Sequence, residues 1–243
     1  MIEVTGLSKN YGARYVVDDL SFRVKTGDVL GFIGPNGAGK STAMKMLAGI
    51  LPVYAGSVRI GPYDVEKFPR EARAMLGFLP ENAPLHSSMS VLAFLRYAAC
   101  MRGIMGSKNR EMKIAKAVDR CALQEVLHED IDALSKGYRR RVCLAQAILN
   151  EPPALIMDEP TDGLDPNQKR EIRSLIGELR STTAIILSTH ILEEVEAVCS
   201  RVLLICAGKR IFEGSREEFL AQAQNGEDVS ALFARLTKDG GRT

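Results

Sequence analysis

The sequence predicts an α/β fold with a mainly parallel β-sheet, an antiparallel β subdomain near the N-terminus and an inserted α-helical subdomain. Three observations lead to this prediction. Strand-like segments rich in Val, Ile and Phe open the chain, helical segments fill residues 85–150, and apolar strands alternate with helices after Pro152. Such alternation favours a parallel sheet that is covered on both faces.

The first 84 residues carry mostly strand signals. Strands are predicted at residues 1–5, 15–24 and 28–34, with turn signals around Tyr11 and Gly27. The pattern then breaks into glycines and resumes with helical spacing over Ser41–Gly49. A short strand at Ser57–Ile60 follows. Residues 1–84 are expected to form the first part of an α/β core with its β subdomain.

Residues 85–150 have a different character, with three amphipathic helices predicted at Val91–Arg102, Asn109–Cys121 and Arg139–Leu149. Strand and helix signals alternate again over 151–216, which is expected to complete the core. The elements expected there are strands at 154–159 and 184–190, helices at Gln168–Arg180 and Leu192–Ser200, and a hairpin at 202–214. Residues 217–243 are expected to be a short helical tail, so that 1–243 form a single domain with a helical insertion.

Composition and charge are those of an ordinary globular protein, with 46% hydrophobic and 26% charged residues. The 32 basic and 30 acidic residues leave a net charge of +2, so no nucleic-acid partner is expected. The five cysteines lack metal-ligand spacing and are expected to be reduced thiols in the cytosol. The longest apolar run, Val202–Ala207, is far shorter than the ~20 residues of a membrane helix, and no signal peptide is expected.

A glycine-rich stretch between a predicted strand and a predicted helix is the first chemical signal. Residues 34–42, GPNGAGKST, fit the phosphate-binding pattern G-x-x-x-x-G-K-[ST]. Glycines allow backbone N–H groups to face a phosphate, and the following helix adds its positive dipole end. Lys40 would contact the terminal phosphates and the Ser41 hydroxyl would ligate Mg²⁺. The alternative is a structural glycine turn. The residues predicted to bind ATP here are Asn36, Gly37, Ala38, Gly39, Lys40, Ser41 and Thr42.

The second signal is the segment ALIMDE at 154–159, an apolar strand that ends in two carboxylates. Buried carboxylates are costly unless they face a cation or an activated water. Asp158 is therefore predicted to hold Mg²⁺, and Glu159 to orient and polarise the attacking water. Acidic loops after strands are common, so this pattern is weak when it occurs alone. It becomes informative because it accompanies the phosphate loop.

In chain order, the motifs GPNGAGKST, LSKGY, LIMDEPTDGLDP and LSTH resemble those of ATP-binding cassette (ABC) ATPases over nearly the whole chain. The signature segment occupies Leu134–Val142, ahead of the two carboxylates, as in that family. The resemblance implies a P-loop ATPase core and a nucleotide-sandwich dimer, formed by two copies or with a second ATPase subunit. Ser135 and Gly137 of one subunit would then face the γ-phosphate held by the other.

The resemblance also implies roles for residues outside these two motifs. Tyr11 would stack on adenine with Val16 as apolar support, although a lone tyrosine in a turn is often only a surface residue. His190, which ends the LSTH segment, would sense the γ-phosphate, the alternative being a structural histidine. Asp165, in GLDP, would touch the opposing subunit and help to shape the water site.

Two departures from the family pattern concern the site. Glu81 stands where the family usually has a Gln that contacts Mg²⁺ and relays nucleotide state to the partner. A carboxylate can still reach the cation but adds negative charge beside the phosphates, and the alternative is a capping or solvated Glu. In the signature, Lys136 and Tyr138 replace Gly and Gln. The charge run Arg139–Arg141 is expected to be a solvated face.

With these departures from the family pattern, the sequence resembles the ATPases of ABC-2-type exporters. This branch of the family includes drug and gliding-motility-associated systems. The expected function is an ATP-hydrolysing subunit that powers transport and is held on the inner face of the membrane by a multi-spanning permease. One alternative is an ATP-gated structural or assembly factor of a motility or cell-division complex that moves no substrate. Soluble ABC proteins of translation or DNA maintenance usually carry two cassettes or a long coiled coil, which this sequence lacks.

Overall fold

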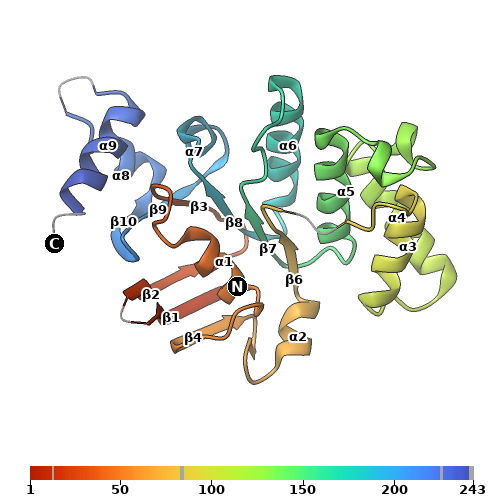
Figure 1. Cartoon of the computed structure of the whole chain (residues 1–243), viewed down its shortest axis with the longest axis horizontal. Helices are drawn as coiled ribbons and strands as arrows, with labels where there is room; N and C mark the ends of the chain where they lie inside the picture. The colour runs from red at the N-terminus through yellow and green to blue at the C-terminus, as the bar shows by residue number, and fades with distance from the viewer. Residues whose placement is uncertain (13, 83–84, 225–226, 241–243) are drawn as a thin grey trace.

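A six-stranded sheet lies at the centre of the computed structural model, which describes residues 1–12, 14–82, 85–224 and 227–240 (Figure 1). Its strand order is β10-β9-β3-β8-β7-β6. The strands are β3 (Val29–Ile33), β6 (Leu76–Leu79), β7 (Ala154–Asp158), β8 (Ala184–Thr189), β9 (Arg201–Cys206) and β10 (Lys209–Ser215). All neighbouring strands are parallel except β10, which runs antiparallel to β9. The mainly parallel sheet of the predicted fold class is therefore confirmed.

The inner strands are apolar along their length because they are buried on both faces. In β3, Val29 and Ile33 pack into one hydrophobic cluster, while Leu30 and Phe32 pack into a second one on the opposite face. β7, β8 and β9 alternate between the same two clusters. Parallel strands with such two-sided burial end at a common edge of the sheet, and this edge carries the candidate site.

A second, antiparallel sheet has the order β2-β1-β4-β5 and is formed by β1 (Ile2–Tyr11), β2 (Arg14–Val24), β4 (Ala55–Ile60) and β5 (Tyr63–Asp64). Helix α1 (Lys40–Leu47) packs against strands of both sheets. β1 continues well beyond the predicted end at residue 5. Register shifts interrupt its pairing between Val4 and Leu7, and Gly6 has a φ of 60°. These irregularities interrupt the pairing close to residue 5, where the predicted strand ended.

Three helices, α3 (Val91–Met101), α4 (Ser107–Arg120) and α5 (Lys136–Ile148), gather at one end of the molecule (Figure 1). Two short 3₁₀ turns, Gln124–Val126 and Ile131–Ala133, lie between α4 and α5. The remaining helices are α2 (Pro69–Ala74), α6 (Pro166–Leu179), α7 (Leu192–Val198), α8 (Arg216–Leu220) and α9 (Val229–Gly240). The predicted helices are all present, whereas α2 was not predicted. The proposed boundary at residue 84 lies outside the described residues.

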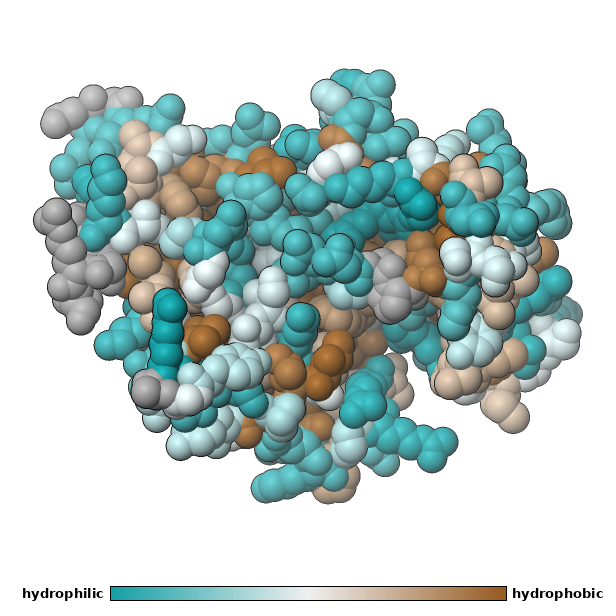
Figure 2. Space-filling model, viewed as in Figure 1, coloured by the Kyte–Doolittle hydropathy of each residue, from teal (hydrophilic) through white to brown (hydrophobic). Residues whose placement is uncertain are grey.

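The exposed surface is mostly hydrophilic, with apolar side chains in several small groups, some of them at the end that α3 and α4 form (Figure 2). Tyr97, Met101, Met105 and Met112 are exposed there. Among the described residues, no helix combines the length and the apolar character that a membrane span requires.

Candidate functional site

The phosphate loop runs from the end of β3 to the start of α1, and its glycines are required by backbone packing. Gly39, the residue that precedes α1, has a φ of 104°. A Cβ at this position would lie 2.2 Å from the carbonyl oxygen of Val16, and a Cβ at Gly34 would lie 2.4 Å from that of Ile205. Any side chain at these two positions would push the loop away from the neighbouring chain segments, so the close fit holds the loop in place.

Lys40 is the first residue of α1 and is only 7% exposed. Its Nζ donates hydrogen bonds to the carbonyl oxygens of Gly34, at 2.7 Å, and Pro35, at 3.2 Å. Burial lowers the pKa of Lys40, while the nearby charges of Glu159, Asp158 and Glu81 act in the opposite direction. Because an ammonium group has three N–H donors, one remains for a phosphate oxygen at the open side of the loop.

The two carboxylates at the end of β7 are held by the neighbouring strand β8. Asp158 is 2% exposed and pairs in register with Ser188, whose Oγ donates a short hydrogen bond to Asp158 Oδ1. The Glu159 N–H donates to both Ser188 Oγ and the Ser188 carbonyl oxygen, each at 3.1 Å. Ser188 therefore fixes both residues of the carboxylate pair, and sequence reasoning missed it.

Glu159 has a φ of 50°, an uncommon value for a residue with a side chain, which turns the chain sharply after β7. The turn brings Glu159 Oε2 to 2.8 Å from Nδ1 of His190 at the end of β8. The Glu159 side chain is 11% exposed and that of His190 is 49% exposed. A shielded carboxylate next to a more accessible imidazole is a suitable arrangement for handling protons and phosphate.

These groups surround a cavity of about 350 Å³. Most residues predicted to bind nucleotide line it: Val16, Asn36, Gly37, Gly39, Lys40, Ser41, Thr42, Glu81, Glu159 and His190, together with Asp162. Ala38, Tyr11, Asp158, Ser135, Gly137 and Asp165 were also predicted for the site but are not among the lining residues. Asp162 was not predicted.

The predicted residues outside the cavity have other contacts in this chain. Tyr11 is exposed at the end of β1, with the Lys9 ammonium 5.8 Å from its ring centroid. Asp165 is the N-cap of α6, where its carboxylate accepts from the N–H groups of Asn167 and Gln168 in a capping box. The roles proposed for Tyr11 and Asp165 toward nucleotide and partner remain predictions.

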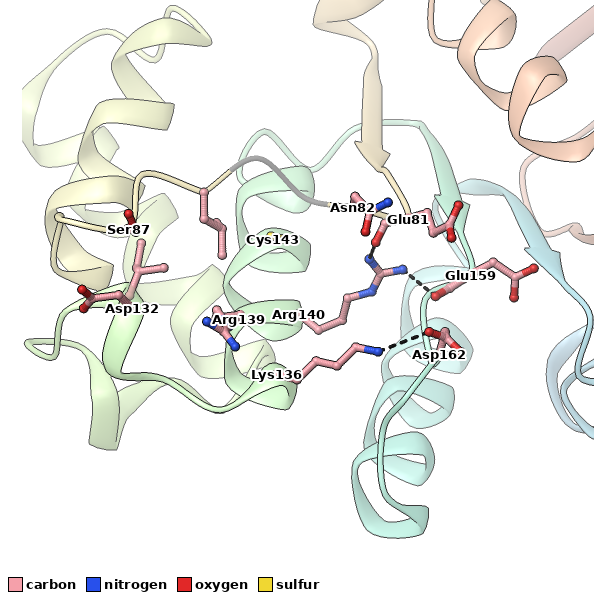
Figure 3. Close-up of a pocket in the computed structure, with 12 residues that line it drawn as sticks. Glu81, Asn82, Ser87, Asp132, Lys136, Arg139, Arg140, Cys143, Glu159 and Asp162 are labelled. Carbon is pink, nitrogen blue, oxygen red and sulfur yellow. Dashed lines mark hydrogen bonds and ion pairs between the residues drawn. The ribbon is translucent and has the colours of Figure 1, made fainter.

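The signature segment lies at the start of α5 and contacts the loop that follows β7. Ser135 is the N-cap of this helix. The Gln168 side chain packs on Gly137, where a Cβ would lie 2.3 Å from the Gln168 side-chain amide nitrogen and would displace that amide group. Lys136, one of the departures from the family pattern, forms an ion pair with Asp162 at 3.2 Å (Figure 3). These contacts within the chain hold the segment against the site.

A second cavity, of about 410 Å³, lies beside the first and shares Glu81, Glu159 and Asp162 with it. Arg140 projects from α5 across this cavity (Figure 3). The expected solvated face of Arg139–Arg141 is confirmed only at Arg139, because Arg140 is only 8% exposed and the Arg141 side chain, which pairs with Glu171, only 12%. Its guanidinium is buried among backbone carbonyl groups supplied by distant parts of the chain.

Comparison with known proteins agrees with this geometry. The family model described as "ABC transporter" matches residues 17–162, from β2 to the loop after β7. The chain belongs to the ABC transporter family. A model described as "AAA domain, putative AbiEii toxin, Type IV TA system" matches residues 129–196. The chain is thus an ABC ATP-binding domain, as the sequence motifs predicted.

Several ABC proteins are similar over most of the chain. The Nod factor export ATP-binding protein I of Paraburkholderia xenovorans is 39% identical over 241 residues, which are 96% of this chain and 76% of that protein. The linearmycin resistance ATP-binding protein LnrL of Bacillus subtilis is 30% identical over 91% of this chain and 71% of its own length. A probable multidrug ABC transporter ATP-binding protein of Escherichia coli is 32% identical over 98% of this chain and 42% of its own length.

Solved ABC structures share the fold. The ATP-binding subunit of an ABC transporter superimposes with a TM-score of 0.88 and 30% identity, over 98% of this chain and 99% of that one. A dimeric bacterial ABC transporter cassette superimposes with a TM-score of 0.80 at 22% identity, over 89% of this chain and 99% of that one. The confirmed fold class therefore includes the β subdomain and the helices that characterise ABC ATPases.

Proposed function

We propose that this ABC ATP-binding domain hydrolyses ATP in a nucleotide-sandwich dimer and thereby drives a membrane exporter. The observation that carries the proposal is the 2.8 Å contact between Glu159 and His190 at the cavity that the phosphate loop lines. Two copies, or this chain and a second ATPase subunit, would close with the phosphate loop of one facing Ser135 and Gly137 of the other. Tyr11 and Val16 would support the adenine.

Glu159 is the proposed general base that aligns and polarises the attacking water. His190 holds Glu159 Oε2, so Oε1 is the carboxylate oxygen directed to the water. Lys40 stabilises the negative charge that develops on the phosphoryl group, because its buried ammonium is poorly solvated and interacts strongly with an anion. His190, half exposed at the cavity, contacts the γ-phosphate. Asp165 orders the loop that approaches the opposing subunit.

The oxygen donors near the phosphate loop fit Mg²⁺. Ser41 lines the cavity, and Asp158, behind the lining residues, has a carboxylate that Ser188 orients. Mg²⁺ commonly takes one or two protein oxygens and completes its shell with phosphate oxygens and water. Ser41 and Asp158 would hold the ion and Glu81 would reach it from the loop after β6. The ion would neutralise phosphate charge and orient the triphosphate.

The transport role is supported by the relatives, whose names refer to Nod factor export, linearmycin resistance and multidrug transport. We infer that the helical subdomain 85–150 contacts a multi-spanning permease on the inner face of the membrane. The exposed apolar side chains of α3 and α4 would form part of that contact. The core of 1–84 and 151–216, with the tail 217–243, would hold the nucleotide.

The substitution E159Q tests the catalytic proposal. It removes the basic oxygen but keeps the size of the side chain, so ATP turnover should fall by about 10³-fold or more while ATP binding persists. ATP-dependent dimers of E159Q, measured by light scattering, should outlast those of the wild type because they cannot hydrolyse their nucleotide. Normal turnover by E159Q would contradict the role of Glu159.

Affinity capture of tagged E159Q with ATP from detergent-solubilised native membranes tests the transport role. Recovery of a multi-spanning protein in stoichiometric amount supports a transporter. Recovery of only single-span or scaffold proteins would instead support an ATP-gated assembly factor, with the same ATPase chemistry.

A further inference from the structure

Arg140 uses its whole hydrogen-bonding capacity within this chain. A guanidinium has five N–H donors, one on Nε and two on each Nη. Nε donates to Pro160 O at 3.1 Å, Nη1 donates to Pro80 O at 2.7 Å and Glu81 O at 2.8 Å, and Nη2 donates to Asp158 O at 2.6 Å and Glu159 O at 2.5 Å. All five acceptors are backbone carbonyl oxygens, so five donors meet five acceptors.

The acceptors belong to two segments that are far apart in the sequence. Pro80 and Glu81 follow β6, whereas residues 158–160 form the sharp turn after β7. Arg140 itself lies on α5, at the helical end of the molecule (Figure 1). The Arg140 side chain therefore joins three parts of the structure. It does so beside Glu81 and Glu159, which line the nucleotide cavity.

Arg140 binds the backbone of Glu81 and Glu159 and not their carboxylates. In Figure 3, Arg140 approaches the backbone of Glu81 and Glu159 from one side, while both carboxylates point to the other side. The Glu159 N–H is bound by Ser188, its carboxylate by His190 and its carbonyl oxygen by Arg140. Contacts to both its N–H group and its carbonyl oxygen thus stabilise the unusual φ of 50° at Glu159.

Burial of the Arg140 guanidinium is costly, and nearby negative charges compensate part of this cost. Burial lowers the pKa of Arg140, whereas the charges of Asp158, Asp162 and Glu81 are among the groups that favour its protonated form. Arginine stays charged under these conditions, and its planar fork matches several carbonyl groups at once. A lysine would bring the charge but only three donors, without the planar arrangement.

We propose that Arg140 is a positioning residue for hydrolysis, which fixes the backbone of Glu159 and Glu81 so that the Glu159 carboxylate is directed at the attacking water. The inference rests on the proposed function, because it assigns Arg140 an effect through Glu159. A change at Arg140 should therefore slow the chemical step without weakening ATP binding, which depends on the phosphate loop. A misplacement of about 1 Å at a catalytic group can cost about 10²-fold in rate.

The experiment compares R140K, R140Q and the control R180Q, which removes the same charge from an exposed side chain at the end of α6 that lines neither cavity. The kcat for ATP, the Kd for ATP and the thermal midpoint are measured for each purified variant. R140K and R140Q should lower kcat by about 10²-fold with an unchanged Kd, whereas R180Q should retain the wild-type kcat. R140K keeps the long stem and the charge, so it provides a folded variant if R140Q unfolds.

A double-mutant cycle with E159Q separates positioning from general support of the fold. If Arg140 acts through Glu159, adding R140K to E159Q should lower the residual rate no further. The inference is overturned by a wild-type kcat in R140K, by parallel losses of kcat and ATP affinity, or by fully additive rate losses. Normal turnover by E159Q alone would instead refute the proposed function, so the two failures are distinguishable.

Discussion

The bond between Ser188 and Asp158 gives a stability prediction that needs no nucleotide. Ser188 is fully buried, and its Oγ donates to a carboxylate that is only 2% exposed. In S188A, Asp158 Oδ1 loses this charge-assisted bond in an environment that water barely reaches. Hydrogen bonds to charged groups contribute about 1.5–3 kcal/mol. The Glu159 N–H retains the Ser188 carbonyl oxygen as an acceptor, so no further loss is expected from it.

For a chain of this length, about 1 kcal/mol corresponds to a shift of about 2–4 °C in the unfolding midpoint. S188A should therefore unfold about 3–12 °C below the wild type. Differential scanning calorimetry of the nucleotide-free protein measures this shift. S181A is the matched control, because its hydroxyl is exposed and donates only to the Glu178 carbonyl oxygen. Its free energy of unfolding should change by no more than about 0.5 kcal/mol.

The double substitution with D158N tests whether the carboxylate charge is responsible. In the D158N background the bond from Ser188 meets a neutral amide, so the additional cost of S188A should fall to about 0.5–1.5 kcal/mol. A midpoint for S188A equal to that of S181A would refute the assignment of this bond. An undiminished cost in the D158N background would refute its dependence on charge.

Two further predictions concern stability. Burial raises the pKa of Glu194 above its usual 4.5, and the nearby Thr189 side chain acts in the opposite direction. Neither carboxylate oxygen of Glu194 has a hydrogen-bond partner among the described residues. The Glu194 carboxyl group therefore ionises at a lower pH in the unfolded chain than in the folded protein, so its ionisation destabilises the folded protein as the pH rises above 4.5. E194Q should be more stable than the wild type at about pH 8, with a gap that narrows toward pH 4.5 in thermal scans; a gap that widens on acidification would contradict the sign. G77A, whose Cβ would lie 2.6 Å from the backbone carbonyl oxygen of Ala147, should lose about 1–3 kcal/mol. G177A, inside α6 with open space at its Cβ, should gain about 0.5–1 kcal/mol, and shifts of the same sign would contradict this reasoning.

The nucleotide site could be predicted from the sequence because its main parts are local. The phosphate loop needs closely spaced glycines and one lysine, and the carboxylates follow directly on an apolar strand. Parallel strands end at the same edge of a sheet, which is why Glu159 and His190 are near each other although they lie at the ends of different strands. Both features depend on short patterns and on a general rule of topology.

The contacts that hold this site could not be predicted in the same way. Arg140 lies within a basic run, and its burial depends on carbonyl groups up to 60 residues away in the chain. Ser188 lies in the LSTH segment, in which the resemblance assigns a role only to His190, and the register with Asp158 reveals the role of the serine. Long-range pairing determines the positions of both Arg140 and Ser188. Helix α2 was missed for a different reason, because it is too short to show a hydrophobic period.

Residues 158–160, at the end of β7 and in the turn after it, contact both the nucleotide site and the helical end of the molecule. Their side chains reach toward Lys40 and His190, while their carbonyl groups are bound by a guanidinium from α5. A displacement of α5 would therefore move Asp158 and Glu159 even if the phosphate loop stayed in place. Because the hydrogen bonds that Lys40 donates among the described residues end on its own loop, ATP affinity and catalytic rate should respond separately to changes at the helical end. A partner bound there could then regulate turnover while leaving nucleotide binding intact.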